Sequence, residues 1–566
     1  MSHAAAVLSA EPTDAPARPS ARPSARLVTV LALLAAFAAS MSLYVATTQA
    51  LSYHARDEGP NASYAISLHA GDLPTIDTPV AHDRERFPQI ARGANREEFD
   101  RHRMIWTANH PPLYYLLGVP WVALADALEN PQVLIVGMRA VSALAYGALV
   151  FLVGLIAFEV TPRRPAAAML ATAITASPAV LAVAAGFVMN DSVAVAASSL
   201  TVLATLRILR LGVTRNRMIV MAVAGTLAAA TKAPGVITAI MCGAALGVTL
   251  LLRDRTRKGF LRATWLTAIA TGVPGLAIGW FYVRNIVLYG DATASSALLE
   301  RYQRVQIDTW FEVMTAPRFW HGWYDHLWVP LQLRGTGLHW VIDVITFVAL
   351  LGLALGVVAR LRDHGRERGL VVSAPRVPSV ATVGLLVLIA HAFVIIVNLA
   401  QFRSGGGNPH ERYLMTIMPL VAIMLAVGLL AIVGAMPWGE IRRREEIAAA
   451  LISAFLVGMT AATFATWVRT QVRLGADVML PEIRPVPYVV LGVGAVCAVV
   501  GVVLPLVWRP RGDAPGSSTG LDPLRGFAGS PAALARPFDK LRTSPSRVAP
   551  SLVPRDGAGS NVGGAA

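Results

Sequence analysis

Repeated long apolar runs constrain this chain more than any other feature of its sequence. A helix needs roughly 20 apolar residues to cross a bilayer core of about 30 Å. About twelve runs approach or reach that length, and only 15% of the 566 residues are charged. The runs cover residues 27–50, 133–159, 166–188, 192–209, 218–231, 235–252, 262–283, 338–359, 379–400, 413–435, 448–468 and 486–508. The sequence therefore predicts an all-α, polytopic transmembrane bundle of about twelve spans.

Basic residues between the runs predict how the chain threads the membrane. Loops on the cytoplasmic side carry an excess of Lys and Arg. If the N-terminus lies inside, every second connection is basic, as at 163–164 and 442–444. A further apolar stretch, 111–126, is short and holds three prolines, and counting it as a span would place 163–164 outside. We therefore expect a multi-pass plasma-membrane protein with both termini cytoplasmic and with 111–126 as an interfacial or re-entrant helix.

The net charge of +15 would suggest a nucleic-acid partner in a soluble protein. Much of the excess lies in short loops and in the tails, so the expected partners are anionic membrane lipids and not nucleic acid. Both cysteines, Cys242 and Cys497, lie inside apolar runs, which argues against a disulfide or a thiolate metal site. Residues 1–26 and 509–566 are rich in Pro, Ala, Ser, Gly and Arg, which predicts disordered cytoplasmic tails.

The unusual polar residues fall on the side opposite the basic connections, where two long loops cover about 51–132 and 284–337. Asp57 and Glu58 stand side by side at the start of the first loop. A carboxylate at a membrane rim suits a general base that takes a proton from an acceptor hydroxyl. The alternative is a solvated pair that begins the loop and caps the next helix.

Four cations on that same side run against the usual distribution of charge: Lys232, Arg284, Arg403 and Arg412. Each alone has an ordinary explanation, an interfacial anchor whose long side chain reaches the headgroups. Taken together, they predict a pocket for a lipid phosphate, because basic side chains bind phosphate through charge-assisted and often bidentate hydrogen bonds.

Four further residues on that side are candidates for substrate binding: His110, Asn190, Asp191 and Asn285. His110 precedes two prolines and is a candidate ligand or proton carrier, or else satisfies a local hydrogen bond. Asp191 is equally well placed as the N-cap of the next span. The outer histidines have no paired metal-ligand spacing, so no metal site and no cofactor is predicted, although dependence on a divalent metal is left open.

The polar segments, in their order, resemble the GT-C superfamily of polyprenyl-phosphate-sugar glycosyltransferases, which includes the protein O-mannosyltransferases and the aminoarabinose transferase of lipid A. The segments are DEGPNASYAISLHAGDLPT, NHPPLYYLL, MRAVSALAYGALV, VMNDS, LAAATKAPG, WFYVRNIVLYGDA and ERYLMTIMPLVA. The resemblance covers about residues 27–435, a catalytic module that would include both long loops. Residues 436–508 would add C-terminal transmembrane helices without a matching motif.

The resemblance implies an inverting transfer of one sugar from a polyprenyl phosphate to an acceptor hydroxyl on the extracytoplasmic face. It implies that Asp57 is the catalytic carboxylate, with Glu58 beside it, and that Lys232, Arg284 and Arg412 lie near the donor phosphate. Relatives often carry a His four residues after the Asp, where this chain has Asn61. The acceptor remains open among a glycan, a lipid and a protein.

Three other functions stay open at this point. A transporter or flippase of lipid-linked sugars predicts charged residues near the membrane midplane and an internal repeat of spans. A polymerase or ligase for lipid-linked glycans would share the outward-facing site. A non-catalytic scaffold predicts that substitution of Asp57 changes stability alone.

Overall fold

A computed structural model describes residues 23–48, 57–81, 86–87, 104–328, 339–367, 377–407, 410–436 and 440–507. Within these ranges the regular structure is helical, apart from one isolated bridge between Pro79 and Met104. Helices suit a bilayer because they satisfy every backbone hydrogen bond within one segment. The predicted tails lie outside these ranges except for residues 23–26, and the first helix already begins at Ala25.

In the described part of the chain, ten helices are long and apolar enough to cross a membrane. They are α1 (Ala25–Thr48), α6 (Gln132–Val160), α9 (Asp191–Leu211), α11 (Ala233–Arg253), α12 (Arg257–Tyr289), α16 (His339–Glu367), α17 (Val380–Ser404), α18 (Met418–Ala435), α19 (Ile441–Arg473) and α20 (Val486–Val507). The 3-10 helices η3 (Glu411–Ile417) and η4 (Pro481–Ile483) precede α18 and α20. The protein is therefore a multi-pass membrane protein with an all-helical fold, as the sequence predicts.

Two of the twelve apolar runs form helices that are not simple spans. The run at 166–188 divides into α7 (Pro165–Ala176) and α8 (Ala179–Ala185), which are bent by 65°. Pro178 stands between them with an extended backbone, at ψ 97°, and it has no N–H to continue the hydrogen bonds of α7. The run at 218–231 forms α10 (Arg215–Ala229), whose 15 residues rise only about 22 Å. The count is ten spans, or eleven with the bent pair, so the predicted twelve is not confirmed.

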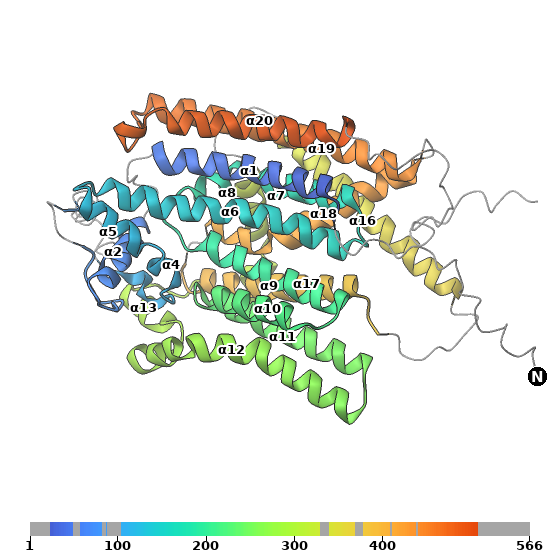
Figure 1. Cartoon of the computed structure of the whole chain (residues 1–566), viewed down its shortest axis with the longest axis horizontal. Coiled ribbons are helices and arrows are strands. Elements are labelled where there is room, and N and C mark those ends of the chain that lie inside the picture. The colour runs from blue at the N-terminus through green and yellow to red at the C-terminus, as the bar shows by residue number, and fades with distance from the viewer. Residues whose placement is uncertain are drawn as a thin grey trace, which may run out of the picture.

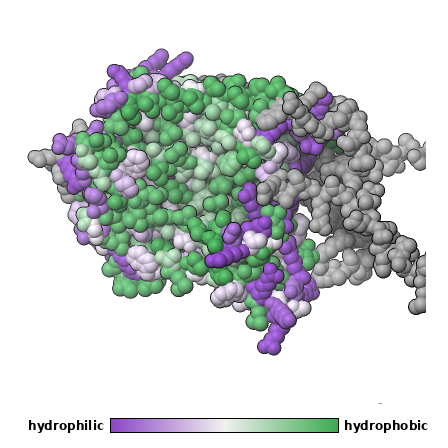
Figure 2. All heavy atoms as spheres, viewed as in Figure 1, coloured by the Kyte–Doolittle hydropathy of each residue, from purple (hydrophilic) through white to green (hydrophobic). Residues whose placement is uncertain are grey.

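Four short helices of the two long loops gather at one end of the bundle, which we call the loop end (Figure 1). They are α2 (Glu58–His69), α4 (Leu113–Leu116), α5 (Val119–Ala127) and α13 (Ser295–Arg301). The same loops also form η2 (Trp106–Asn109), α14 (Trp310–Thr315) and α15 (Pro317–Trp328). The apolar segment 111–126 thus contributes α4 and α5 and no long helix. Figure 2 shows a broad apolar surface along the bundle with polar residues toward both ends, as expected of a belt that faces lipid.

The opposite end of the bundle, which we call the basic end, holds the arginine-rich connections. Arg210 of α9 lies 2.7 Å from the Glu159 carboxylate at the end of α6. The Arg253 guanidinium donates to the Leu209 carbonyl at 2.8 Å, and Arg164 pairs with Glu445 of α19. These contacts bring the basic connections together, away from the long loops.

A close approach of α16 and α18 leads to a prediction about stability. A Cβ on Gly428 would lie 1.9 Å from the Ala349 carbonyl oxygen, so only glycine fits there. Small residues let membrane helices approach this closely. Gly428→Ala is expected to cost about 1–3 kcal/mol through overpacking and to lower the melting temperature in detergent. The matched control is Gly458→Ala on α19, where an added Cβ meets nothing within 4 Å; equal melting of the two variants would contradict this packing.

Candidate active site

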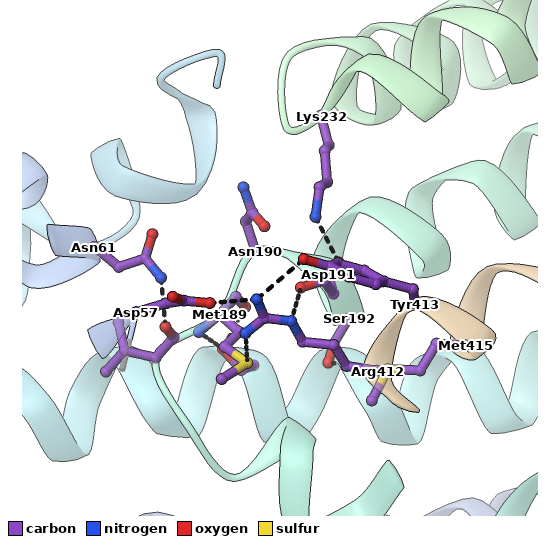
Figure 3. Close-up of polar contacts among 12 residues, drawn as sticks. Asp57, Asn61, Met189, Asn190, Asp191, Ser192, Lys232, Arg412, Tyr413 and Met415 are labelled. Atoms are coloured by element: carbon purple, nitrogen blue, oxygen red, sulfur yellow. Dashed lines mark hydrogen bonds and ion pairs between the residues drawn. The ribbon is translucent and has the colours of Figure 1, made fainter. Parts of the chain in front are cut away.

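Asp57 lies at the loop end, immediately before the first residue of α2. It occupies the N-cap position, but its side chain makes no capping hydrogen bond. Instead, its carboxylate forms an ion pair with Arg412 of η3, and 16% of its side chain is exposed (Figure 3). The interpretation of Asp57 as a helix cap is therefore wrong.

Arg412 and Lys232 both contact Asp191, so positive and negative groups alternate. The Nε atom of Arg412 lies 3.7 Å from Oδ2 of Asp191, and Nζ of Lys232 donates to Oδ1 of Asp191 at 2.6 Å. We call Asp57, Arg412, Asp191 and Lys232 the four-charge network (Figure 3). Asp191 is the first residue of α9 and Lys232 is the N-cap residue of α11. Three connections and the start of α2 thus meet at one place.

Soft and aromatic groups of the same connections surround the two cations. Met189, in the turn before α9, accepts a hydrogen bond through its sulfur from Arg412 at 2.9 Å. The ring of Tyr413 lies 5.4 Å from Nζ of Lys232 and 5.2 Å from the Arg412 guanidinium carbon. Both distances allow cation–π attraction, which restrains the cations without adding negative charge.

Glu58 differs from Asp57 although the two are adjacent. Neither Glu58 nor Arg139 of α6 exposes any of its side chain. Arg139 donates to both carboxylate oxygens of Glu58, at 2.7 and 2.6 Å, and the Val188 amide donates to one of them at 2.8 Å. Glu58 therefore has the geometry of a structural ion pair that fixes α2 to α6 and to the turn before α9.

Asn61, which stands where relatives often have histidine, is also buried and fully engaged. Its side-chain amide donates to the Val188 carbonyl at 2.8 Å and accepts from the Tyr115 hydroxyl at 3.0 Å. Asn190 donates to the same Tyr115 hydroxyl at 3.4 Å. Asn61 and Asn190 thus hold the turn before α9 against α2 and α4, at the edge of the network.

The remaining predicted residues make their contacts elsewhere. Arg284 and Asn285 lie inside α12, because that helix continues to Tyr289. Arg284 donates to the Pro74 carbonyl at 2.8 Å, and Asn285 donates to the Asn109 and Ala292 carbonyls at 3.1 and 3.0 Å. Arg403 donates to the Gly407 carbonyl at 3.3 Å. These contacts attach loop segments to the bundle, and the structure does not bring the three residues into the four-charge network.

His110 lies beside the network and stays neutral. Burial, then the positive charge of Lys232, lowers its pKa to about 3, although Asp191 acts in the opposite direction. Its ordinary value is 6.5, so the unfolded chain binds a proton below that pH while the folded protein does not. The stability that neutral His110 contributes is present above pH 6.5 and is lost as the pH falls toward 3.

This shift predicts a pH-dependent melting temperature. Between pH 7.5 and 5 the stability of the wild type should fall by up to about 1.4 kcal/mol per pH unit below 6.5 from this group. His110→Gln removes the titrating group, so its melting temperature in detergent should fall less over the same range. Identical slopes for the two proteins would contradict the shift.

The residues that could bind a metal do not gather in the described ranges. No group of three or more His, Cys, Asp or Glu side chains is arranged to hold an ion in that part of the chain. The network itself offers two carboxylates, each already paired with a cation.

Sequence reasoning missed Arg139 and Tyr413. Arg139 did carry a signal, since it is the one charge in the interior of the apolar run 133–159, whose other charge, Glu159, stands at its end, and such residues are rarely without a specific partner. Tyr413 directly follows a predicted site residue, but nothing in its position indicates that its ring contacts Lys232.

The fold and the network define a multi-pass membrane protein with a charged site at one end of its bundle. A family model described as a predicted membrane protein, DUF2142, matches residues 54–421. That range is more than half of the chain, and the protein belongs to this family. No curated protein matches the sequence.

Among solved structures, the protein is similar to ArnT from Cupriavidus metallidurans bound to undecaprenyl phosphate, at 16% identity and a TM-score of 0.40, over 85% of this chain and 78% of that chain. It is also similar to the Archaeoglobus fulgidus oligosaccharyltransferase with Zn and sulfate, at 14% identity and a TM-score of 0.42, over 76% of this chain and 52% of that chain. Both are GT-C glycosyltransferases, the superfamily that the sequence resembles.

Proposed function

We propose that this protein transfers a sugar from a polyprenyl-phosphate donor to an acceptor hydroxyl, with inversion, at the extracytoplasmic membrane surface. The observation that carries the proposal is the four-charge network. It holds a partly exposed carboxylate, Asp57, at the end of a membrane bundle. Asp57 pairs with one cation, Arg412, which Asp191 links to a second, Lys232. A lipid phosphate reaches such a site from the bilayer, so the enzyme needs no nucleotide-binding domain.

Arg412 and Lys232 would bind the donor phosphate. As the bond between the sugar C1 and the phosphate oxygen breaks, its electron pair leaves with the polyprenyl phosphate. Fixed cations stabilise the charge that grows on this leaving group. Asp191 holds both cations in place, with Nζ of Lys232 only 2.6 Å from its carboxylate. This preorganisation spares the reaction the cost of orienting two long side chains.

Asp57 would act as the general base. The acceptor oxygen attacks C1 from the face opposite the phosphate and forms the new glycosidic bond, which inverts the configuration. The hydroxyl proton passes to the Asp57 carboxylate. Arg412 orients that carboxylate in the free protein, and an incoming phosphate offers the same guanidinium a third anion beside Asp57 and Asp191. Glu58 is not part of this step, because its carboxylate is buried and engaged by Arg139.

The competing functions differ in where they need charge. A transporter of lipid-linked sugars would use charged groups near the midplane of the bundle. The four-charge network instead lies at helix ends. Asp191 begins α9 and Lys232 precedes α11, while Asp57 precedes α2 and Arg412 lies in η3. A polymerase or ligase for lipid-linked glycans would use the same site with a longer glycan on the donor lipid. Only the length of that glycan distinguishes this function from transfer of a single sugar.

Binding of undecaprenyl phosphate to the purified protein, followed by native mass spectrometry, tests the donor part of the proposal. Loss of one charge-assisted phosphate contact costs about 1.5–3 kcal/mol, so Lys232→Met should bind this lipid at least tenfold more weakly than wild type. The matched control is Lys258→Met, at the basic end near the start of α12. Equal loss in the two variants, or no binding by the wild type, would contradict the proposal.

A further inference from the structure

A groove between α10 and α12 is not explained by the four-charge network. The two helices approach closely where Gly225 faces Pro274, since a Cβ on Gly225 would lie 3.2 Å from the proline Cγ. From there toward the basic end the helices leave a groove of about 470 Å³. Its lining includes Arg215, Ile219 and Val223 of α10 with Leu266, Ile269 and Val273 of α12.

The walls of the groove face the lipid. Ile219 is 49% exposed, Val223 51% and Val273 44%. All three apolar side chains lie on helices of the bundle, so their exposed surface is one that lipid would cover. A hollow with apolar walls on this surface excludes water, so a hydrocarbon chain is the occupant that fills it. Sites for small ligands typically measure about 300–1,000 Å³, and this groove falls within that range.

Positive charge lies at one end of the groove. Arg215 is the first residue of α10 and lines the groove itself. The amide groups of this first turn add the positive end of the helix dipole. Arg262 lies one turn before Leu266 on α12 and so shares its face. Asp254 is the nearby carboxylate, and its oxygen accepts from both the amide and the hydroxyl of Thr256.

The length of α10 adds a reason for a phosphate at this place. Its 15 residues rise about 22 Å, less than the bilayer core of about 30 Å. Arg215 begins α10 and Lys232 follows its last turn. The distance between these two residues along the helix is therefore shorter than the thickness of the bilayer core. A lipid whose anionic headgroup moves toward the first turn of α10 would pair with the positive charge of Arg215.

We propose that this groove is a binding site for one anionic phospholipid of the leaflet at the basic end. One acyl chain lies between α10 and α12, and the phosphate contacts Arg215, Arg262 and the first turn of α10. The site is separate from the four-charge network, which lies at the loop end, and the proposal does not depend on the proposed function. Because α10 leads directly to Lys232, the lipid supports the helix that positions one network cation.

The test is native mass spectrometry of the delipidated full-length protein, titrated with phosphatidylglycerol or phosphatidylcholine of the same acyl chains. Wild type is expected to bind one phosphatidylglycerol about tenfold or more tightly than phosphatidylcholine. Each arginine near the surface contributes about fivefold, so Arg215→Gln with Arg262→Gln should remove that preference. Ala222→Trp, which fills the groove, should weaken binding of both lipids at this site. Arg255→Gln, an exposed arginine of the α11–α12 turn, is the matched control.

Several results would overturn the proposal. One is equal affinity of the wild type for the two lipids, and another is wild-type selectivity in the double arginine variant. A third is a double variant that loses undecaprenyl phosphate while keeping phosphatidylglycerol, which would make the groove a site for a polyprenyl lipid. Melting temperatures are measured for every variant. If Ala222→Trp does not fold, the lipid selectivity of the double arginine variant, compared with that of Arg255→Gln, decides whether the proposal holds.

Discussion

Asp57→Asn is expected to lower the rate constant of sugar transfer by about 10²–10⁴-fold, the usual contribution of a positioned general base. Asparagine keeps the shape of the side chain but takes no proton from the acceptor hydroxyl. Arg412 retains its contact with Asp191, at 3.7 Å, so the phosphate-binding cations stay oriented. The loss should therefore appear in kcat, with little change in the binding of the donor lipid.

The matched control for this prediction is Asp72→Asn. Asp72 is an exposed carboxylate that lies just after α2, away from the four-charge network. It should retain wild-type kcat. If Asp57→Asn folds, binds donor and works at more than a tenth of the wild-type rate, then Asp57 is not the base.

Arg139→Met is expected to produce the largest loss of stability among single substitutions at the loop end. The substitution leaves the Glu58 carboxylate fully buried and without the arginine that donates to both of its oxygens. Removing one member of a buried ion pair costs about 3–5 kcal/mol, since the remaining charge is uncompensated. The melting temperature in detergent and the yield of folded protein should both fall sharply.

A double variant separates the charge from the packing. Arg139→Met with Glu58→Leu replaces both charges by apolar groups, which is often neutral or stabilising in buried pairs. The double variant should melt well above Arg139→Met. If the double variant melts below the single one, or if Arg139→Met melts like the wild type, the pair is not the structural element described above.

The helices could be predicted from the sequence because the signal is local. A run of apolar residues long enough to span a bilayer forms a helix whatever its neighbours do. Within the described residues, each of the twelve runs contributes at least one helix. The number of spans could not be predicted in the same way. It depends on a 65° bend at Pro178 and on the length of α10, neither of which changes the hydropathy of its run.

The site could be predicted in part. Each of its four members is a charged residue at an outer helix end, which the sequence alone reveals. Their pairing depends on contacts between distant parts of the chain, 41 positions apart for Lys232 and Asp191 and 355 positions apart for Arg412 and Asp57. Adjacent carboxylates in the sequence gave no basis for separating Asp57 from Glu58. The separation follows from the direction of each side chain, toward Arg412 in one case and toward the buried Arg139 in the other.

The measurement that tests the central proposal most directly is release of polyprenyl phosphate from a panel of polyprenyl-phosphate sugars by the purified wild-type protein. This readout needs no knowledge of the sugar in advance, and cell-envelope extract supplies the acceptor. The account predicts time-dependent release from at least one donor, with the sugar recovered on the acceptor in inverted configuration. A folded protein that binds undecaprenyl phosphate yet releases it from no donor would contradict the account and favour transport of the lipid.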